Sequence, residues 1–184
     1  MSEEMIVENC SPTLAGIKTG NLFTCSCETQ EELRRDVRAF NKTFVPKGLR
    51  MIPLRYENKR AMIYLYRPSR LREDFANGDT RELLAQFHYP AANPDQCVVR
   101  LIRRLRKFEE FPHEIGLFLG YPPEDVRGFI EQGANRCKCA GFWKVYGDEE
   151  KARKTFETYR RCMSDYMNQW EKGLSIDRLA VAMA

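Results

Sequence analysis

Four of the seven cysteines form two pairs with one intervening residue, Cys25-Ser26-Cys27 and Cys137-Lys138-Cys139. Residues two apart on a strand point the same way, so each pair can present two thiols on one face. Four thiolates brought together could hold zinc or an iron–sulfur cluster, or two could form a redox dithiol. The spacing is shorter than the roughly two to four intervening residues that are usual in zinc sites. Free cysteine is also among the most buried residue types, so plain packing is the alternative.

The second pair has the stronger functional character of the two. It follows the turn-rich residues 133–136 and lies between the cations Arg136 and Lys138. Nearby cations favour the thiolate, so we expect accessible thiols with a lowered pKa at this pair. The first pair alternates with Phe23, which is more typical of a strand that faces a core.

Further candidate ligand-binding residues are Cys10, Lys18, Thr19, His113 and Trp143. Cys10 or His113 could join the second cysteine pair around a metal, a cluster or a haem-type tetrapyrrole. The Lys-Thr step lacks the order of a Walker A loop, so the glycines beside it are expected to form a tight turn near a ligand. We expect Cys10, this turn and His113 to line one concavity. An enzyme with a substrate in a cleft behind Lys18 and Trp143 is a third possibility, and a purely structural His113 is the alternative.

Charge is distributed unevenly along the chain. Residues 33–107 contain 18 Lys/Arg against 7 Asp/Glu, whereas the whole chain carries a net charge of only +4. Such a segment can meet phosphates, an acidic protein partner or nucleic acid, and the candidate residues for contact with a protein partner are Arg100, Arg103, Arg104 and Lys107. A solvated helix face is the alternative. Nucleic acid is an unlikely ligand in this interpretation, because the paired helices around Gly120 are acidic.

The composition is that of a globular protein with a single domain over residues 1–184. The chain is 43% hydrophobic and 30% charged, and it contains no apolar run of the roughly 20 residues that span a bilayer. The acidic N-terminus lacks the features of a signal peptide, so a cytoplasmic location is expected. An odd number of cysteines in a chain of this length favours reduced thiols.

Hydrophobic periodicity predicts an α+β fold, with a small, mostly antiparallel sheet of three to four strands and about six helices. Expected strands cover residues 21–27, 49–56, 60–67 and 141–146, and the middle two form a hairpin. Pro53 indicates an edge strand or a bulge. Thr29 and Glu32 form a capping box for a helix whose apolar face is Leu33, Val37, Phe40 and Phe44.

Later helices are predicted from the same kind of pattern. Asn93 and Pro94 begin one, whose apolar stripe is Val98, Leu101, Ile102, Leu105 and Phe108. Short helices are expected over residues 112–119 and 123–132. The longest covers residues 148–173 and is amphipathic, with apolar positions Ala152, Phe156, Tyr159, Met163, Tyr166 and Trp170.

Three motifs together resemble a known bacterial family. They are residues 10–23 (CSPTLAGIKTGNLF), residues 113–122 (HEIGLFLGYP) with 124–126 (EDV), and residues 137–139 (CKC) with 141–148 (GFWKVYGD). The chain is similar, over nearly its whole length, to the family catalogued as domain of unknown function 3793. The resemblance implies an anaerobic bacterium and genes nearby for flavodoxin-like or iron-uptake proteins, and it implies no catalytic residues.

Two functional hypotheses follow. The first is a cytoplasmic thiol protein of anaerobic redox or iron metabolism, which binds zinc, an iron–sulfur cluster or a haem-type group through Cys137 and Cys139, or through both cysteine pairs. The second is a non-enzymatic interaction or regulatory module that docks an acidic, flavodoxin-like partner through the basic middle segment. Exposed, converging thiols favour the first hypothesis, and scattered, buried thiols favour the second.

Overall fold

The computed structural model describes residues 1–107 and 111–183, except for the side chain of Lys107. The chain divides into two compact units. The first unit consists of Met1–Arg70 together with Arg161–Ala184, and the second unit consists of Leu71–Arg160. The second unit is therefore inserted, in sequence, between two segments of the first. That both units form a single domain stays a prediction.

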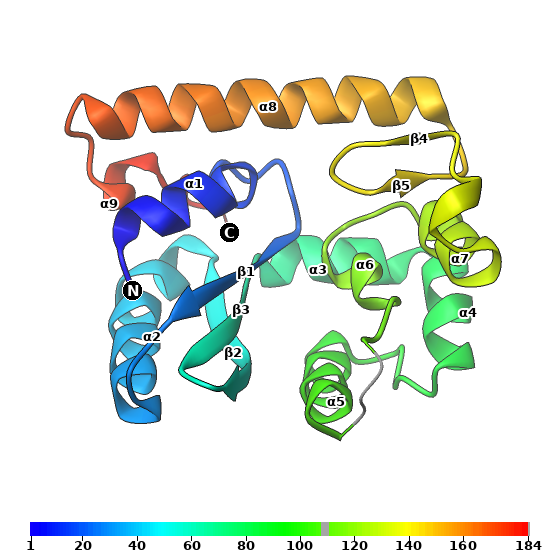
Figure 1. The fold of residues 1–184 in the computed structure, drawn as a ribbon, viewed down its shortest axis with the longest axis horizontal. Helices are drawn as coiled ribbons and strands as arrows, with labels where there is room; N and C mark the ends of the chain where they lie inside the picture. Colours follow the sequence, from blue (N-terminus) through cyan, green and yellow to red (C-terminus); the bar gives the residue numbers. More distant parts are fainter. Residues whose placement is uncertain (108–110, 184) are drawn as a thin grey trace. The chain divides into compact units, whose positions relative to one another are not determined.

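A three-stranded antiparallel sheet forms the middle of the first unit. Its order is β1 (Gly20–Ser26), β3 (Arg60–Tyr66) and β2 (Arg50–Glu57), with β3 in the centre (Figure 1). The predicted hairpin is β2–β3, and its turn residues Asn58 and Lys59 have φ angles of 49° and 58°. Two left-handed residues in succession are the signature of a type I′ turn, whose twist matches that of the strands. Pro53 lies on the edge strand β2, at the point where the register with β3 shifts. The edge strand and the bulge that were given as alternatives for Pro53 are therefore both present.

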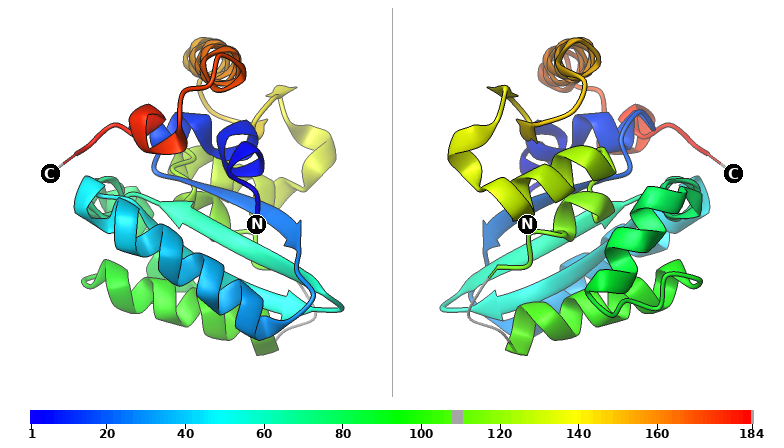
Figure 2. Two further views of the ribbon diagram at one scale, coloured as in Figure 1. Left: turned by 90° about the vertical axis from the view of Figure 1, so that its left-hand side faces the viewer. Right: turned by 90° about the vertical axis from the view of Figure 1, so that its right-hand side faces the viewer.

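Three helices bury their apolar residues in one core with this sheet. They are α1 (Glu3–Leu14), α2 (Gln30–Phe44) and α9 (Ile176–Leu179), and the 3₁₀ turn η1 (Val45–Lys47) follows α2. Thr29 caps α2, because its Oγ1 accepts a hydrogen bond from the Glu32 amide at 3.1 Å. All four predicted core residues of α2 are buried, and the helix packs along β2 (Figure 2). Helix α1 was not predicted, because Pro12 near its end has the appearance of a turn residue.

A fully buried arginine, Arg67, joins separate segments of the first unit. Its guanidinium donates to the carbonyl oxygens of Thr13, Leu14 and Val181 at 2.7 Å each, and to that of Lys47 at 3.1 Å. Burial lowers the pKa of Arg67 to about 10. Four backbone acceptors take the place of a carboxylate partner around this cation.

The second unit is mostly helical. Its elements in chain order are α3 (Pro68–Ala76), α4 (Gly78–Gln86), α5 (Pro94–Lys107), α6 (Ile115–Phe118), α7 (Pro123–Gln132), the 3₁₀ turn η2 (Ala134–Arg136), β4 (Cys139–Ala140), β5 (Lys144–Val145) and α8 (Glu149–Glu171). The first three residues of α3 and the C-terminal part of α8 belong to the first unit. The strand predicted over residues 141–146 is shorter than expected, because only β5 pairs there, with β4.

The α+β class with a small antiparallel sheet and a long helix near the C-terminus is confirmed. The described residues form nine α-helices, where about six were expected. In α8 the predicted positions Ala152, Phe156 and Tyr159 are buried, whereas Met163, Tyr166 and Trp170 are half-buried. None of the helices in the described residues has the length and apolarity needed to cross a membrane.

Candidate functional site

Helix α5 is held in place by its cap and by its apolar side. The side-chain oxygen of Asn93 accepts from the Gln96 amide at 3.1 Å, and Pro94 takes the first helical position. Val98, Leu101 and Leu105 are buried as predicted, and Ile102 is half-buried. The predicted stripe also included Phe108, which lies outside the described residues. The cap and the buried side chains therefore fix the position of α5, and its opposite side is polar.

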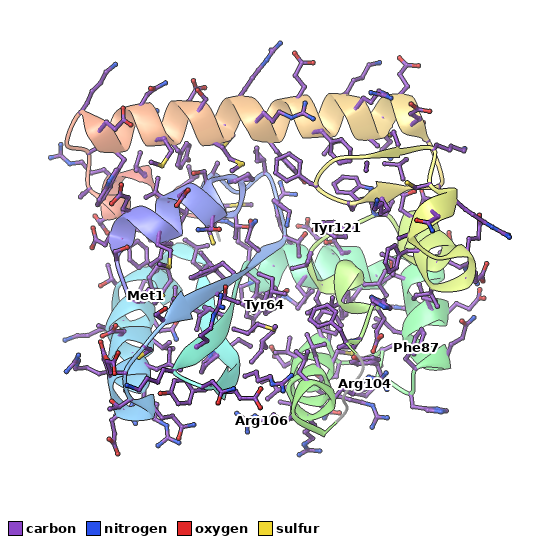
Figure 3. The ribbon with its side chains drawn as sticks, in the orientation of Figure 1. Met1, Tyr64, Phe87, Arg104, Arg106 and Tyr121 are labelled. Atoms are coloured by element: carbon purple, nitrogen blue, oxygen red, sulfur yellow. The ribbon has the colours of Figure 1, made fainter. Side chains whose placement is uncertain are left out.

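Arg104 belongs to a buried network and not to the free polar side of α5. Its Nε lies 2.8 Å from Oε1 of Glu114, whose side chain is 2% exposed, and Tyr89 donates its hydroxyl to the same oxygen at 2.9 Å. The guanidinium also lies over the rings of Phe87 and Tyr89, 5.7 and 5.9 Å from their centroids. Desolvation, followed by the charge of Glu114, raises the pKa of Tyr89. In Figure 3, Arg104 and Phe87 lie on one side of α5, and Arg106 lies on the other.

The other arginines of α5 have no such partner. Within the described residues, Arg100, Arg103 and Arg106 take part in no ion pair and no hydrogen bond. Helix α8 shows the opposite arrangement, since Arg153 and Lys154 each pair at 2.6 Å with a glutamate one turn earlier. Like charges at helical spacing repel one another, so Arg100, Arg103 and Arg106, which are spaced three residues apart, repel one another.

A cavity of about 560 Å³ opens beside these arginines, between α5 and the end of α4. Its polar lining consists of His88, Gln96, Arg100 and Arg103. The remaining lining is apolar or aromatic and comes from Ala85, Tyr89, Pro90 and Val99, the last of which is 46% exposed. No carboxylate lines it in the part of the chain that the structure describes. We call the four exposed or half-exposed residues Val99, Arg100, Arg103 and Arg106 the α5 basic surface. The side chain of the fourth predicted partner-binding residue, Lys107, lies outside the described part.

His88 reaches the cavity from an unusual backbone position. The end of α4 is a Schellman motif, in which the amides of His88 and Tyr89 donate to the carbonyls of Ala85 and Leu84 at 2.9 and 3.0 Å. His88 occupies the left-handed position of this motif with φ 60°, which normally favours glycine. Sequence reasoning interpreted His88 only as a helix end without a partner, and nothing in the residue pattern links it to α5.

The two cysteine pairs differ in accessibility. Cys25 and Cys27, 4% and 7% exposed, belong to the core of the first unit, where burial raises the pKa of both. Cys137 and Cys139 of the second unit are half-buried, whereas the other five cysteines are buried. The expectation of a lowered pKa is wrong for Cys139, because desolvation raises it and the nearby Glu149 adds to this effect. The cation Lys138 is also engaged elsewhere, since its Nζ donates to the Gly147 carbonyl at 2.7 Å.

The metal site predicted at the two cysteine pairs stays a prediction, and the described part of the chain contains no ready-made site. In that part, no group of three or more His, Cys, Asp and Glu residues has an arrangement that could hold a metal ion. The pairs themselves belong to different units, as do the ligand-binding candidates. Cys10, Lys18 and Thr19 are buried in the first unit, where Lys18 donates to the Gly20 carbonyl. Desolvation raises the pKa of Cys10 despite the charge of Lys18.

The candidates in the second unit have packing contacts. His113 is exposed, and its ring meets the edge of Phe129 at 4.8 Å between centroids. Trp143 donates its indole N–H to Asp125 at 2.6 Å and stacks on Tyr121 at 4.9 Å. Because these candidates are divided between the two units, the shared concavity stays a prediction.

A second cavity, of about 590 Å³, is lined by the predicted ligand-binding residue Trp143, but Lys18, the other residue named for the expected cleft, does not line it. Trp143, Tyr121 and Tyr159 form its aromatic lining, and six carboxylates line it: Glu73, Asp74, Asp79, Glu124, Asp125 and Asp148. Buried Asp125 organises the adjoining loop by accepting from the amides of Tyr146 and Gly147 at 2.7 Å. These residues come from four separate sequence segments, so no local motif indicated the cavity.

The fold and the site define an α+β protein whose second unit presents a basic helix surface that has no ion pair among the residues the structure describes. A family model described as a protein of unknown function (DUF3793) matches residues 6–180, and the chain belongs to this family, as its three motifs indicated. No curated protein and no solved structure matches the chain.

Proposed function

We propose that this protein is an interaction module that docks an acidic protein partner through the α5 basic surface. The observation that carries this proposal is that three arginines of one helix have no ion pair in the described residues, whereas on α8 Arg153 and Lys154 each pair with a glutamate. A helix that keeps repelling charges exposed is suited to a partner that brings the opposite charge. Val99 adds an apolar contact among them, as is common at interfaces.

We propose a partner of flavodoxin-like type, which is an acidic protein. Charge complementarity steers association more than it adds to final affinity. We therefore expect the association rate to fall steeply with salt, because exposed charges are screened over about 8 Å at physiological ionic strength. The cytoplasmic location also stays a prediction.

The test measures binding of a purified flavodoxin to the full chain at about 50 and 500 mM salt. The double variant Arg103→Glu/Arg106→Glu should weaken binding about tenfold at low salt and much less at high salt. Each of the single variants Arg103→Glu and Arg106→Glu is compared with Arg72→Glu on α3, which reverses one charge at a residue that is also exposed on a helix of the second unit. Arg104 is left intact, since its reversal would break the Glu114 pair.

Three outcomes contradict the proposal. Equal loss of affinity in the control variant would mean a general charge effect. Binding that ignores both salt and the double variant would exclude the α5 basic surface. Tighter, equally salt-dependent binding of a double-stranded DNA would assign the surface to phosphate contacts instead.

We also propose a second function, metal or cluster binding at Cys137 and Cys139, because these are the two cysteines that are not buried. Two thiolates supply half of the four ligands of a tetrahedral zinc site, so the remaining ligands would come from a second molecule. Anaerobic purification followed by elemental analysis and an absorbance spectrum tests this function. Added zinc should protect both thiols from alkylation, and protection should disappear in Cys137→Ser; unchanged labelling would contradict it.

A further inference from the structure

The cavity beside α5 has the charge of a receptor for a doubly negative group. Arg100 and Arg103 line it, and neither has an ion pair within the described residues. The Nε of Arg100 is fully buried and has no hydrogen-bond acceptor there. A guanidinium that has lost part of its hydration without gaining an acceptor is destabilised, and a bound anion would offset this loss. Two unpaired arginines match a dianion better than a single carboxylate.

His88 provides independent support for a ligand. Its side chain lines the same cavity, although its backbone is left-handed with φ 60°. Glycine fits this position of a Schellman motif without strain, and asparagine tolerates it better than most residues. A strained imidazole that is exposed to a cavity contributes nothing to packing that would explain the strain. Its contribution is a third hydrogen-bonding group beside the two arginines.

The rest of the cavity suits an apolar body attached to the anion. The ring of Tyr89 forms part of its wall with Pro90 and Val99. The Tyr89 hydroxyl already donates to Glu114, so the ring is the part of this residue that is offered to a ligand. A volume of about 560 Å³ lies within the usual range of small-molecule sites.

The geometry points to a binding site for a small organic phosphate monoester, with the phosphate on Arg100, Arg103 and His88 and the organic body against Tyr89, Pro90 and Val99. This site goes beyond the docking of an acidic protein and does not require it. The two functions share Val99, Arg100 and Arg103, so a bound phosphate monoester would compete with a docked partner.

Titration of the full chain with phenyl phosphate tests the site. Binding is measured by calorimetry or by changes in amide chemical shifts. Binding should saturate at one site and be about tenfold tighter than that of inorganic phosphate, which lacks the body, and of benzoate, which carries one charge. Benzyl alcohol should not bind. Equal affinity for inorganic phosphate would overturn the role of the apolar wall, and equal affinity for benzoate would overturn the requirement for a dianion. No saturable binding of phenyl phosphate would overturn the site. None of these measurements involves a protein partner, so the failure of docking and the failure of this site are distinguishable.

Variants then assign the ligands. Arg100→Gln should weaken phenyl phosphate binding at least tenfold, and Arg100→Lys should restore only part of the loss, because an ammonium lacks the planar fork. His88→Asn and His88→Gly should each weaken binding several-fold. His88→Gly should also raise the unfolding temperature, because it removes the strain, and this increase separates lost binding from lost folding. Arg72→Gln is the charge-matched control and should leave the affinity unchanged. Unaltered affinity in Arg100→Gln or in both His88 variants would overturn the assignment.

Discussion

Two adjacent arginines of α5 show how a residue's surroundings decide its role. Arg103 is exposed and unpaired in the described part of the chain, whereas Arg104 is 24% exposed and bound to Glu114. They differ by about 100° around the helix, which places one on the α5 basic surface and the other against Tyr89 and Phe87. The cysteines divide in the same way, because their depth, and not their spacing, determines which of them can react.

At the residue scale we expect Cys137 to be the first thiol to react. Cys137 is half-buried and not buried. Desolvation raises the pKa of the neighbouring Cys139, so a smaller fraction of Cys139 is thiolate near neutral pH than in an ordinary exposed cysteine. Brief alkylation of the native protein, followed by peptide mass spectrometry, should label Cys137, then Cys139, and the five buried cysteines only after unfolding. Labelling of Cys97 or Cys162 at the rate of Cys137 would contradict this order.

The buried thiols also make stability depend on alkaline pH. Desolvation raises the pKa of both Cys97 and Cys162 from about 9 to about 11. The unfolded chain loses these protons near pH 9 while the folded chain keeps them, so the folded state is stabilised fully below pH 9 and progressively less up to pH 11. The free energy of unfolding, from urea titrations, should fall over this interval. The slope should be shallower in Cys97→Ala/Cys162→Ala, and an unchanged slope would assign the effect to other groups.

At the element scale, the pair between α5 and the residue before α6 links two helices of the second unit. Glu114 forms an ion pair with Arg104 and accepts a hydrogen bond from Tyr89, so its buried carboxylate is shared by α5 and the segment after α4. Breaking such a pair lowers the free energy of unfolding more than breaking a surface pair does, because loss of either partner leaves the other charge desolvated.

We expect Glu114→Gln to lower the free energy of unfolding by about 2–3 kcal/mol, since Arg104 would keep its charge in a partly buried position. The matched control is Glu82→Gln, which removes an exposed contact with Arg127 at 3.4 Å and should cost at most about 0.5 kcal/mol. Urea unfolding measures both. Equal losses would show that the Glu114 pair contributes no more than a surface pair.

Elements with strong local signals could be predicted from the sequence, and the site could be predicted only in part. The cap at Thr29, the stripe of α2 and the turn at Asn58 each depend on residues close in the chain. Arg100 and Arg103 were identified by the charge of their segment. His88 and Glu114 were not linked to them, because the packing of α4 and α6 against α5 depends on contacts between distant residues. For the same reason, Trp143 was identified as a ligand-binding candidate, whereas the carboxylates that line the cavity with it were not.

At the scale of the whole molecule, the charge excess of residues 33–107 is divided between the two units, because the first unit contains residues 33–70 of this segment and the second contains residues 71–107. In the first unit, Arg67 is turned inward and serves backbone carbonyls. In the second, the α5 basic surface is turned outward. The net charge of a segment therefore does not indicate its function until each cation is placed.

Replacement of Arg67 should destabilise the first unit strongly. Arg67→Met would leave the carbonyls of Thr13, Leu14 and Val181 without their donor, and we expect a loss of about 3 kcal/mol or more. Arg67→Lys should recover little, because an ammonium cannot reach four separated acceptors. Arg38→Met on the exposed side of α2 is the control and should change stability by at most about 0.5 kcal/mol. A loss below 1 kcal/mol in Arg67→Met would contradict the role of this residue as a junction.

The bond from Arg67 to Val181 has a consequence for synthesis on the ribosome. Domains usually fold in the order in which they emerge, but the first unit needs residues 161–183 to complete its core. The second unit is continuous in sequence, so it can fold while the first still lacks α9 and the acceptor for Arg67. The segment that is translated first is thus finished last, and during that interval its apolar surfaces are the natural substrate of a chaperone.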